Sequence, residues 1–310
     1  MSAYLQQLTV RLAEGLGRVD EAIRKRHRDY LLKAQRPDGG FAGRMGDSDL
    51  YYTAFGLRAL SILGELYGEP AERAAEFLKQ EIRRQQSMVD FFSLFYAANL
   101  LSASAGIDIL ETMEPNWPQR VEQLLNSLRR PDGGFAKANE GVAGSTYNTF
   151  LIMLVFELMQ LPIPDHEGIV RFLEQQFDPE GGWREIRVSK RAGTNPTAAA
   201  VASLKILDAL SPDVVEPTID FLCDMQTDEG GLRANSRIPI ADLLSSFTGG
   251  LTLIDLNAIQ EIDLAAFERF VNSLQLPSGG FQAAIWDEAH DVEYTFYGLG
   301  CLSLIELTRS

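Results

Sequence analysis

The stretch RPDGGFAGRMGDSDLYYTAFGLRAL, residues 36–60, contains a Pro-Asp-Gly-Gly turn, a polar loop and then a long apolar segment. Proline cannot continue a helix, aspartate favours a turn, and glycine accepts the positive φ that ends a helix. The apolar segment has the character of a buried helix. The stretch therefore predicts a junction between two helices, and its repetition along the chain decides the fold.

Related turns follow Gly39 at Gly133, Gly181, Gly230 and Gly279, in steps of 94, 48, 49 and 49 residues. Because the first step is almost twice the others, we expect a sixth unit, without the two glycines, near residue 86. An amphipathic stretch precedes each turn, and a more apolar stretch follows each loop. Each unit is predicted to be a helical hairpin with a half-buried outer helix and a buried inner helix.

Internal repetition of this length is typical of helical arrays. The nearly all-apolar inner helices favour closure into a ring over an open solenoid, because an inner helix of a ring contacts its outer partner and its inner neighbours. The predicted fold class is all-α, an (α/α)6 toroid forming a single domain over residues 1–310. Its six units are expected at about residues 20–64, 70–104, 118–161, 166–210, 215–258 and 265–308.

In such a ring the segments after the glycines, here called the post-glycine loops, lie on one rim and lead into the inner helices. Function is expected there, because loops held by a rigid scaffold commonly carry binding sites. The post-glycine loops are residues 41–48, 135–144, 183–192, 232–241 and 281–290.

Composition restricts the possible partners. The chain has 310 residues, of which 45% are hydrophobic, so it can bury a core without disulfides or metals. A formal net charge of -15 disfavours nucleic acid and anionic membranes as general partners. No apolar run is expected to be long enough to span a membrane, and the N-terminus lacks the apolar core of a signal peptide. These features favour a cytoplasmic protein.

The segment QRPDGGF at residues 35–41 and its four relatives resemble the repeat of protein prenyltransferase β subunits and, more distantly, of squalene and terpene cyclases. The resemblance extends over about nine tenths of the chain. It implies the toroid fold, an isoprenoid diphosphate as ligand, and a separate helical partner similar to the transferase α subunit.

The resemblance also implies roles within the segment GRMGDSDLYYT. Arg44 matches a diphosphate-binding arginine, and Asp49 and Tyr52 match an aspartate and a tyrosine of the transferase site. The position of the zinc-binding cysteine holds Tyr51 instead. A catalytic zinc needs three protein ligands and one open position.

The third zinc ligand of the family is a histidine three residues after an aspartate. No alignment register leaves a cysteine or a histidine where zinc needs one, since Asp90 is followed by Ser93, Asp242 by Leu244 and Asp291 by Tyr294. The sequence therefore argues against zinc, and the leading interpretation is a diverged prenyltransferase-like protein that binds an isoprenoid diphosphate without the usual zinc ligands.

Three alternatives remain open. A terpene or squalene-type cyclase would use a rim aspartate such as Asp49 as the acid, although Asp47-Ser48-Asp49-Leu50 is one carboxylate short of the Asp-x-Asp-Asp motif. A non-catalytic isoprenoid-binding or scaffold toroid would have kept the ring and lost the chemistry. A carbohydrate-active barrel of six hairpins would need two carboxylates across a sugar cleft, and the Gln and Gly-Gly-aromatic signature argues against it.

Basic residues gather in the post-glycine loops, which is unusual in so acidic a chain. Guanidinium groups bind phosphate oxygens bidentately, beside the free N–H groups of helix N-termini. Solvated loops that balance nearby acids are the competing interpretation. The candidate diphosphate-binding residues are Arg44, Arg184, Arg187, Lys190 and Arg191, with Lys137, Arg233 and Arg237 in neighbouring loops.

Aspartates 49, 90, 242 and 291 recur just before inner helices, where a side-chain oxygen that caps the helix is worth about 1 kcal/mol. Acid chemistry or metal binding are the competing roles, and a ring of carboxylates could hold magnesium. The candidate catalytic residues are Asp49, Tyr52 and Asp291. His27 and His166 are expected on the surface, whereas His290 on the rim is placed to titrate.

Aromatic residues begin the inner helices and would form either core or an apolar funnel for an isoprenoid chain, with π faces that could shelter an allylic cation. The candidate funnel residues are Tyr51, Phe55, Phe92, Tyr147, Tyr294 and Tyr297.

Overall fold

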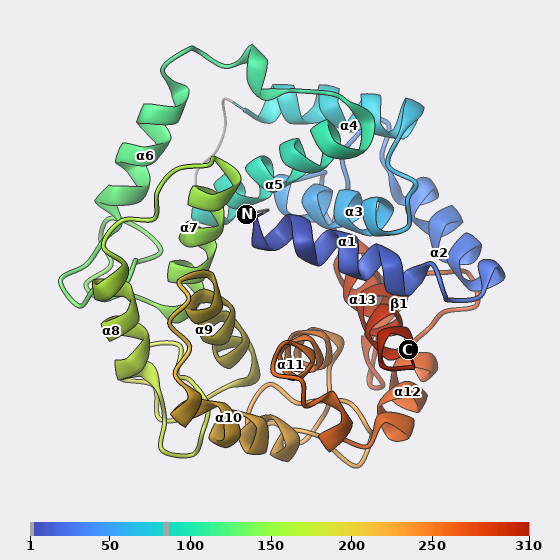
Figure 1. Ribbon diagram of the computed structural model, residues 1–310. Coiled ribbons are helices and arrows are strands. Elements are labelled where there is room, and N and C mark those ends of the chain that lie inside the picture. Colours follow the sequence, from blue (N-terminus) through green and yellow to red (C-terminus); the bar gives the residue numbers. More distant parts are fainter. Residues whose placement is uncertain (1–2, 83–86, 310) are drawn as a thin grey trace. The chain divides into compact units, whose positions relative to one another are not determined.

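The computed structural model describes residues 3–82 and 87–309, and these are mostly helical (Figure 1). The junction of the sixth unit, expected near residue 86, falls on residues 83–86 and lies outside the described residues. The chain divides into two compact units: unit 1 comprises Met1–Pro118 and Ser273–Ser310, and unit 2 comprises Gln119–Asn272.

The elements of unit 1 come from both ends of the chain. They are α1 (Tyr4–Leu16), α2 (Glu21–Ala34), α3 (Leu50–Ile62), α4 (Gly68–Glu81), α5 (Met88–Ala105), the 3-10 helix η1 (Leu110–Thr112), β1 (Phe281–Ala284), β2 (Asp287–Asp291) and α13 (Val292–Thr308). Unit 2 contains α7 (Thr146–Leu158), α8 (His166–Gln176), α9 (Thr194–Ile206), α10 (Pro212–Asp224), α11 (Leu243–Asp255) and η2 (Ile259–Glu261). Helices α6 (Trp117–Ser127) and α12 (Leu264–Ser273) contain the two unit boundaries.

Burial separates two kinds of helix. The inner helices α3, α7, α9 and α11 are buried along most of their length, as their apolar sequences predict. The outer helices α2, α8 and α10 bury one face and leave charged residues in solvent. Each of the six predicted sequence units contains one helix of each kind, with α1 as an additional helix before the first unit.

The two glycines of each turn have different packing roles. The first has a positive φ, and its Cα lies against a carbonyl of the following outer helix, so that a Cβ on Gly39 would come within 2.1 Å of the Arg73 oxygen. The second lies against an aromatic ring, as Gly134 does against Phe172. Gly133, Gly181 and Gly230 make the same carbonyl contact within unit 2. The turns therefore act as packing contacts between consecutive hairpins.

In unit 1 the two ends of the chain pack on each other. Helix α1 packs against α13 and α3. In its contact with α13, Ser303 Oγ donates a hydrogen bond to the Leu12 carbonyl at 2.8 Å. The last turn contacts the first outer helix, because a Cβ on Gly279 would lie 2.4 Å from the Arg26 oxygen. The final repeat thus completes the packing of the first one.

His27 is wrongly predicted as a surface residue, because its side chain is fully buried at this junction. The Gly280 N–H donates to Nδ1 at 3.0 Å, and Nε2 lies 3.1 Å from Gln275 Oε1. The ring stacks on Phe281 with centroids 4.6 Å apart. His166 is exposed at the start of α8, as expected, and His290 is exposed beside the ring of Tyr30.

Two further expectations need correction. Residues 281–290 contain most of an antiparallel hairpin, β1 with β2, in place of an irregular loop. Helix α5, with 18 residues, is long and apolar enough to cross a membrane by length and composition, although more than half of it is buried inside the protein. Burial of this kind is typical of a core helix.

Candidate functional site

Arg44 reaches the hairpin and the start of α13 within unit 1. One terminal nitrogen lies 2.7 Å from Asp287 Oδ2, and its Nε lies 3.4 Å from Asp291 Oδ2. The guanidinium also lies 5.6 Å from the centroid of the Tyr294 ring. The proposed diphosphate-binding arginine is therefore already neutralised by two carboxylates, and an anionic ligand would have to compete with them.

Of the three candidate catalytic residues, Asp291 is a partner of Arg44, Tyr52 lies near enough to feel its charge, and Asp49 begins the same helix as Tyr52. Asp49 caps α3 by accepting from the Tyr52 N–H at 2.8 Å, and Asp291 caps α13 by accepting from the Tyr294 N–H at 3.0 Å. Burial raises the pKa of Asp49 and also that of Tyr52, whose ring packs on Gly43. Both carboxylates thus have a structural role whether or not they also take part in chemistry.

Capping also accounts for the other two recurring aspartates. Asp242 caps α11 by accepting from the Ser245 N–H at 2.7 Å. Asp90 is the third residue of α5, where it forms a capping box with Ser87, so it does not precede the helix as expected.

The aromatic candidates of unit 1 form one cluster on α3, α5 and α13. The Phe55 ring centroid lies 5.0 Å from that of Tyr51 and 5.3 Å from that of Tyr297, and Tyr294 contacts Tyr297. Phe92 joins the same cluster from α5. Tyr147 is in unit 2, where its side chain is 43% exposed.

Glu293 adds a buried carboxyl group to this cluster. Its Oε1 accepts a hydrogen bond from the Tyr51 hydroxyl at 2.6 Å, and the residue is only 9% exposed. Burial raises the pKa of Glu293, and the hydrogen bond from Tyr51 opposes that rise. The side chain lies beside the candidate catalytic residues but was not itself among them.

Arg58 lies in the middle of the same cluster, on α3. Its guanidinium carbon is 4.5 Å from the ring centroids of Phe55 and Tyr96, 5.1 Å from that of Phe92 and 5.9 Å from that of Phe296. The residue is 8% exposed. A cation of the protein therefore occupies aromatic faces that were expected to shelter a cation of the substrate.

The remaining basic candidates belong to unit 2. Arg184 is committed to Asp178, with guanidinium nitrogens 2.5 and 2.6 Å from Oδ2. Arg187, Lys190 and Arg191 are exposed. Arg184 therefore holds the turn together, whereas the other three are available to a ligand.

Backbone and side-chain contacts bring the post-glycine loops of unit 2 next to one another. Arg191 donates to Ser236 Oγ at 2.9 Å, which places it beside the loop of Arg237. Thr146, which follows the loop of residues 135–144, donates its N–H to the Glu185 carbonyl at 2.9 Å. This bond connects that loop to the loop of residues 183–192. Burial raises the pKa of Glu185, whose carboxylate accepts from the Ser145 hydroxyl at 2.5 Å.

No group of three or more His, Cys, Asp or Glu side chains among the described residues could hold a metal ion. Asp287 and Asp291 both face Arg44, so a cation at this position would have to displace the guanidinium.

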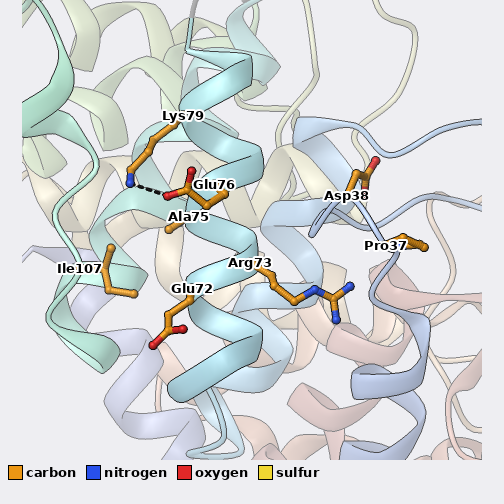
Figure 2. A pocket seen from close by; sticks show the side chains of 8 residues that line it. All are labelled: Pro37, Asp38, Glu72, Arg73, Ala75, Glu76, Lys79 and Ile107. Carbon is orange, nitrogen blue, oxygen red and sulfur yellow. Dashed lines mark hydrogen bonds and ion pairs between the residues drawn. The ribbon is translucent and has the colours of Figure 1, made fainter.

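A pocket of about 570 Å³ lies on the surface of unit 1, between α4 and the first turn (Figure 2). Its charged side chains have mixed sign: Lys79 pairs with Glu76, and Arg73 donates to the Arg36 carbonyl. None of the candidate site residues lines it. The pocket is lined by Pro37, Asp38, Glu72, Arg73, Ala75, Glu76, Lys79 and Ile107.

Comparison with known proteins identifies a family whose model matches this chain. The model of the prenyltransferase alpha-alpha toroid domain matches residues 8–88, 71–238 and 153–310. No curated protein has a sequence that matches the chain.

Solved structures share the fold at low sequence identity. Protein geranylgeranyltransferase-I of Candida albicans, solved with GGPP, is 16% identical with a TM-score of 0.72, and 91% of each chain is covered. A type II terpene cyclase from Scytonema is 15% identical with a TM-score of 0.63, covering 97% of this chain and 98% of the other. The GH76A alpha-1,6-mannanase from Salegentibacter sp. HEL1_6 is 12% identical with a TM-score of 0.62, covering 92% and 98%. The fold class is the all-α, alpha-alpha toroid.

Proposed function

Because the chain belongs to the prenyltransferase alpha-alpha toroid family, we propose that it binds an isoprenoid diphosphate as a diverged, prenyltransferase-like protein without the usual zinc ligands. The transferase solved with GGPP supports this ligand class, and the type II terpene cyclase, solved also with geranylgeranyl dihydroxybenzoate as substrate, supports the isoprenoid chain alone. The family and the likeness support the class of ligand, and the residues below support its proposed place.

The observation that supports the proposal most is the group of exposed cations on adjacent loops of unit 2. Within the part of the chain that the structure describes, Arg187, Lys190 and Arg191 form no ion pair with a carboxylate, and Arg237 is exposed beside Ser236. Arg44 and Arg184, in contrast, are each held by an aspartate. Diphosphate oxygens are suitable partners for unpaired guanidinium groups, which bind them bidentately.

A thermal-shift titration tests the proposal. The full chain would be titrated with geranyl, farnesyl and geranylgeranyl diphosphate, with and without magnesium, with inorganic pyrophosphate as the control ligand. We expect a saturable shift with one chain length. Absence of a saturable shift with all three diphosphates would contradict the proposal and favour the scaffold alternative.

A double variant tests where the diphosphate binds. Arg187→Gln with Arg191→Gln should weaken binding at least about tenfold, since a hydrogen bond to a charged group contributes about 1.5–3 kcal/mol. The matched control is Arg171→Gln with Arg269→Gln, which removes two exposed charges from the outer helices of unit 2. Equal affinity in the two double variants would show that the head group binds elsewhere.

The cyclase alternative is less well supported by the aromatic cluster. The Arg58 guanidinium lies within 6 Å of four ring centroids there, and its positive charge would raise the energy of a carbocation at the same place. Incubation with linear isoprenoids and analysis of the products separates the two activities, because cyclisation needs no acceptor.

Two associated expectations follow from the resemblance to the transferases. One is a helical partner similar to the α subunit, and the other is a cytoplasmic location. Co-purification of the tagged chain from its own cells, with fractionation of those cells, would test both.

A further inference from the structure

The three post-glycine loops of unit 2 differ in charge from the rest of the chain. Residues 135–144, 183–192 and 232–241 contain seven lysines and arginines and two glutamates, a formal charge of +5 in a chain whose net charge is -15. The outer helix α10 of the same unit has four exposed acidic residues and no basic one. Positive charge is therefore concentrated in these loops. Their basic residues are Lys137, Arg184, Arg187, Lys190, Arg191, Arg233 and Arg237.

Hydrogen bonds hold the three loops at one end of unit 2. Helices α7 and α9 each begin with a threonine whose N–H donates to the next loop at 2.9 Å, Thr146 to the Glu185 carbonyl and Thr194 to the Ala234 carbonyl. Helix α9 packs against both α7 and α11, and each of these three helices follows one of the loops. Arg130 donates to three carbonyls of the first loop and keeps it in shape. The loops therefore share one end of the unit.

Aliphatic side chains stand in water between the cations of these loops. Val142 and Val188 are the most exposed of them, at 93% and 82%. The Ser189 N–H donates to the Ile186 carbonyl at 2.9 Å and closes a tight turn. Arg187 and Val188 form the corner of that turn, so a cation and an aliphatic group point outward together. Exposed apolar groups gathered on one face mark an interaction surface. The exposed aliphatic residues are Val142, Ile186, Val188, Ile238 and Ile240.

We propose that this end of unit 2 docks on a lipid bilayer that contains anionic lipids. The aliphatic side chains would enter the boundary between head groups and acyl chains, and the cations would pair with lipid phosphates. Two features favour a bilayer over an acidic protein. The aliphatic groups stand on separate loops, and a fluid apolar layer accommodates them without matching pockets. The aromatic residues of these loops, Phe135 and Trp183, are buried, whereas protein interfaces are enriched in aromatic anchors.

The acidic remainder of the chain orients this contact. Interactions between exposed charges are largely screened beyond about 8 Å at physiological ionic strength. Lipid phosphates therefore respond to the loops that face them more than to the net charge of the molecule. An acidic surface such as that of α10 is repelled by the same lipids, so the three loops are the part of unit 2 that we expect to face the bilayer.

Co-sedimentation of the full chain with vesicles tests the inference. Vesicles with equal parts of phosphatidylcholine and phosphatidylglycerol should bind at least about tenfold more tightly than phosphatidylcholine alone, because each cation near an anionic surface contributes about fivefold. Added salt should weaken the binding. Equal binding to the two kinds of vesicle, or binding to neither, would overturn the inference.

The double variant Val142→Ser with Val188→Ser removes the two most exposed aliphatic groups and keeps every charge. We expect its affinity for the anionic vesicles to fall at least about tenfold, since each buried CH2 group contributes about fourfold. The matched control Val10→Ser removes an exposed valine from α1 in unit 1 and should bind as the unaltered chain does. Undiminished affinity in the double variant would overturn the inference, and equally tight binding of soluble polyglutamate would then indicate an acidic protein partner.

The three isoprenoid diphosphates of the thermal-shift titration separate this inference from the proposed function, which places a head group on two of the same cations. If both hold, Arg187→Gln with Arg191→Gln weakens the binding of vesicles and of diphosphate, whereas the valine variant weakens only vesicle binding. Vesicle binding by a chain that binds none of the diphosphates would support the bilayer and contradict the proposed function. Diphosphate binding without vesicle binding would do the reverse.

Discussion

His27 shows how a single buried side chain makes stability depend on pH. The neutral ring is required, because Nδ1 accepts from the Gly280 N–H while Nε2 faces Gln275 Oε1, and burial lowers its pKa from 6.5 to about 4. The unfolded chain therefore binds more protons between these two values, and stability should fall as the pH drops from 6.5 to about 4, by up to about 3 kcal/mol. Urea unfolding of the unaltered protein and of His27→Gln across this pH range separates the contribution of the histidine to stability from that of the many carboxylates. Parallel pH profiles for the two proteins would contradict this account.

The sequence could predict some of the site residues and not others, and the reason is the distance between partners along the chain. Arg44, Asp49 and Tyr52 lie within one repeat, so the resemblance could suggest them as candidates. Glu293 and Tyr51 are 242 positions apart in the sequence, and His27 and Gly280 are 253 apart, so neither contact is visible locally. The neighbours of His27 in the sequence are basic, and they suggested an exposed side chain. Arg58 did give a signal, as the one charge in a largely apolar helix, but three of its four ring partners come from α5 and α13.

At the scale of elements, the turns were predictable because each repeats the same local sequence. Two glycines with similar φ, Gly39 and Gly46, allow the contribution of turn packing to stability to be measured. Gly39 and Gly46 both have a φ above +90°, but a Cβ on Gly39 would lie 2.1 Å from the Arg73 oxygen, whereas nothing lies within 4 Å of one on Gly46. Gly46→Ala should cost about 1–2 kcal/mol of backbone strain, and Gly39→Ala at least about 2 kcal/mol more, because the turn must separate from α4. Chemical denaturation measures both. Equal losses would mean that the turn does not hold the hairpins together.

The β1–β2 hairpin was missed because such short strands are specified mainly by pairing with each other.

For the molecule as a whole, the division into units predicts unequal effects of shortening the chain. Residues 273–310 supply the last turn, the hairpin and α13 to unit 1, whereas unit 2 is a continuous segment. A chain ending at residue 272 should lose amide protection mainly in residues 3–82 and 87–118, and less in residues 119–272. Hydrogen exchange compared with the full chain measures this, and an even loss across both segments would contradict it.

The contact between the last turn and the first outer helix also bears on synthesis at the ribosome. Unit 2 can complete its internal contacts once residue 272 has emerged, but α2 must wait until Gly279, Gly280 and Phe281 arrive to cover Arg26 and His27. During that interval the face of α2 that carries His27 is uncovered on the nascent chain. The first repeat to be translated is thus among the last to be finished, and it is where we expect chaperones to bind the growing polypeptide.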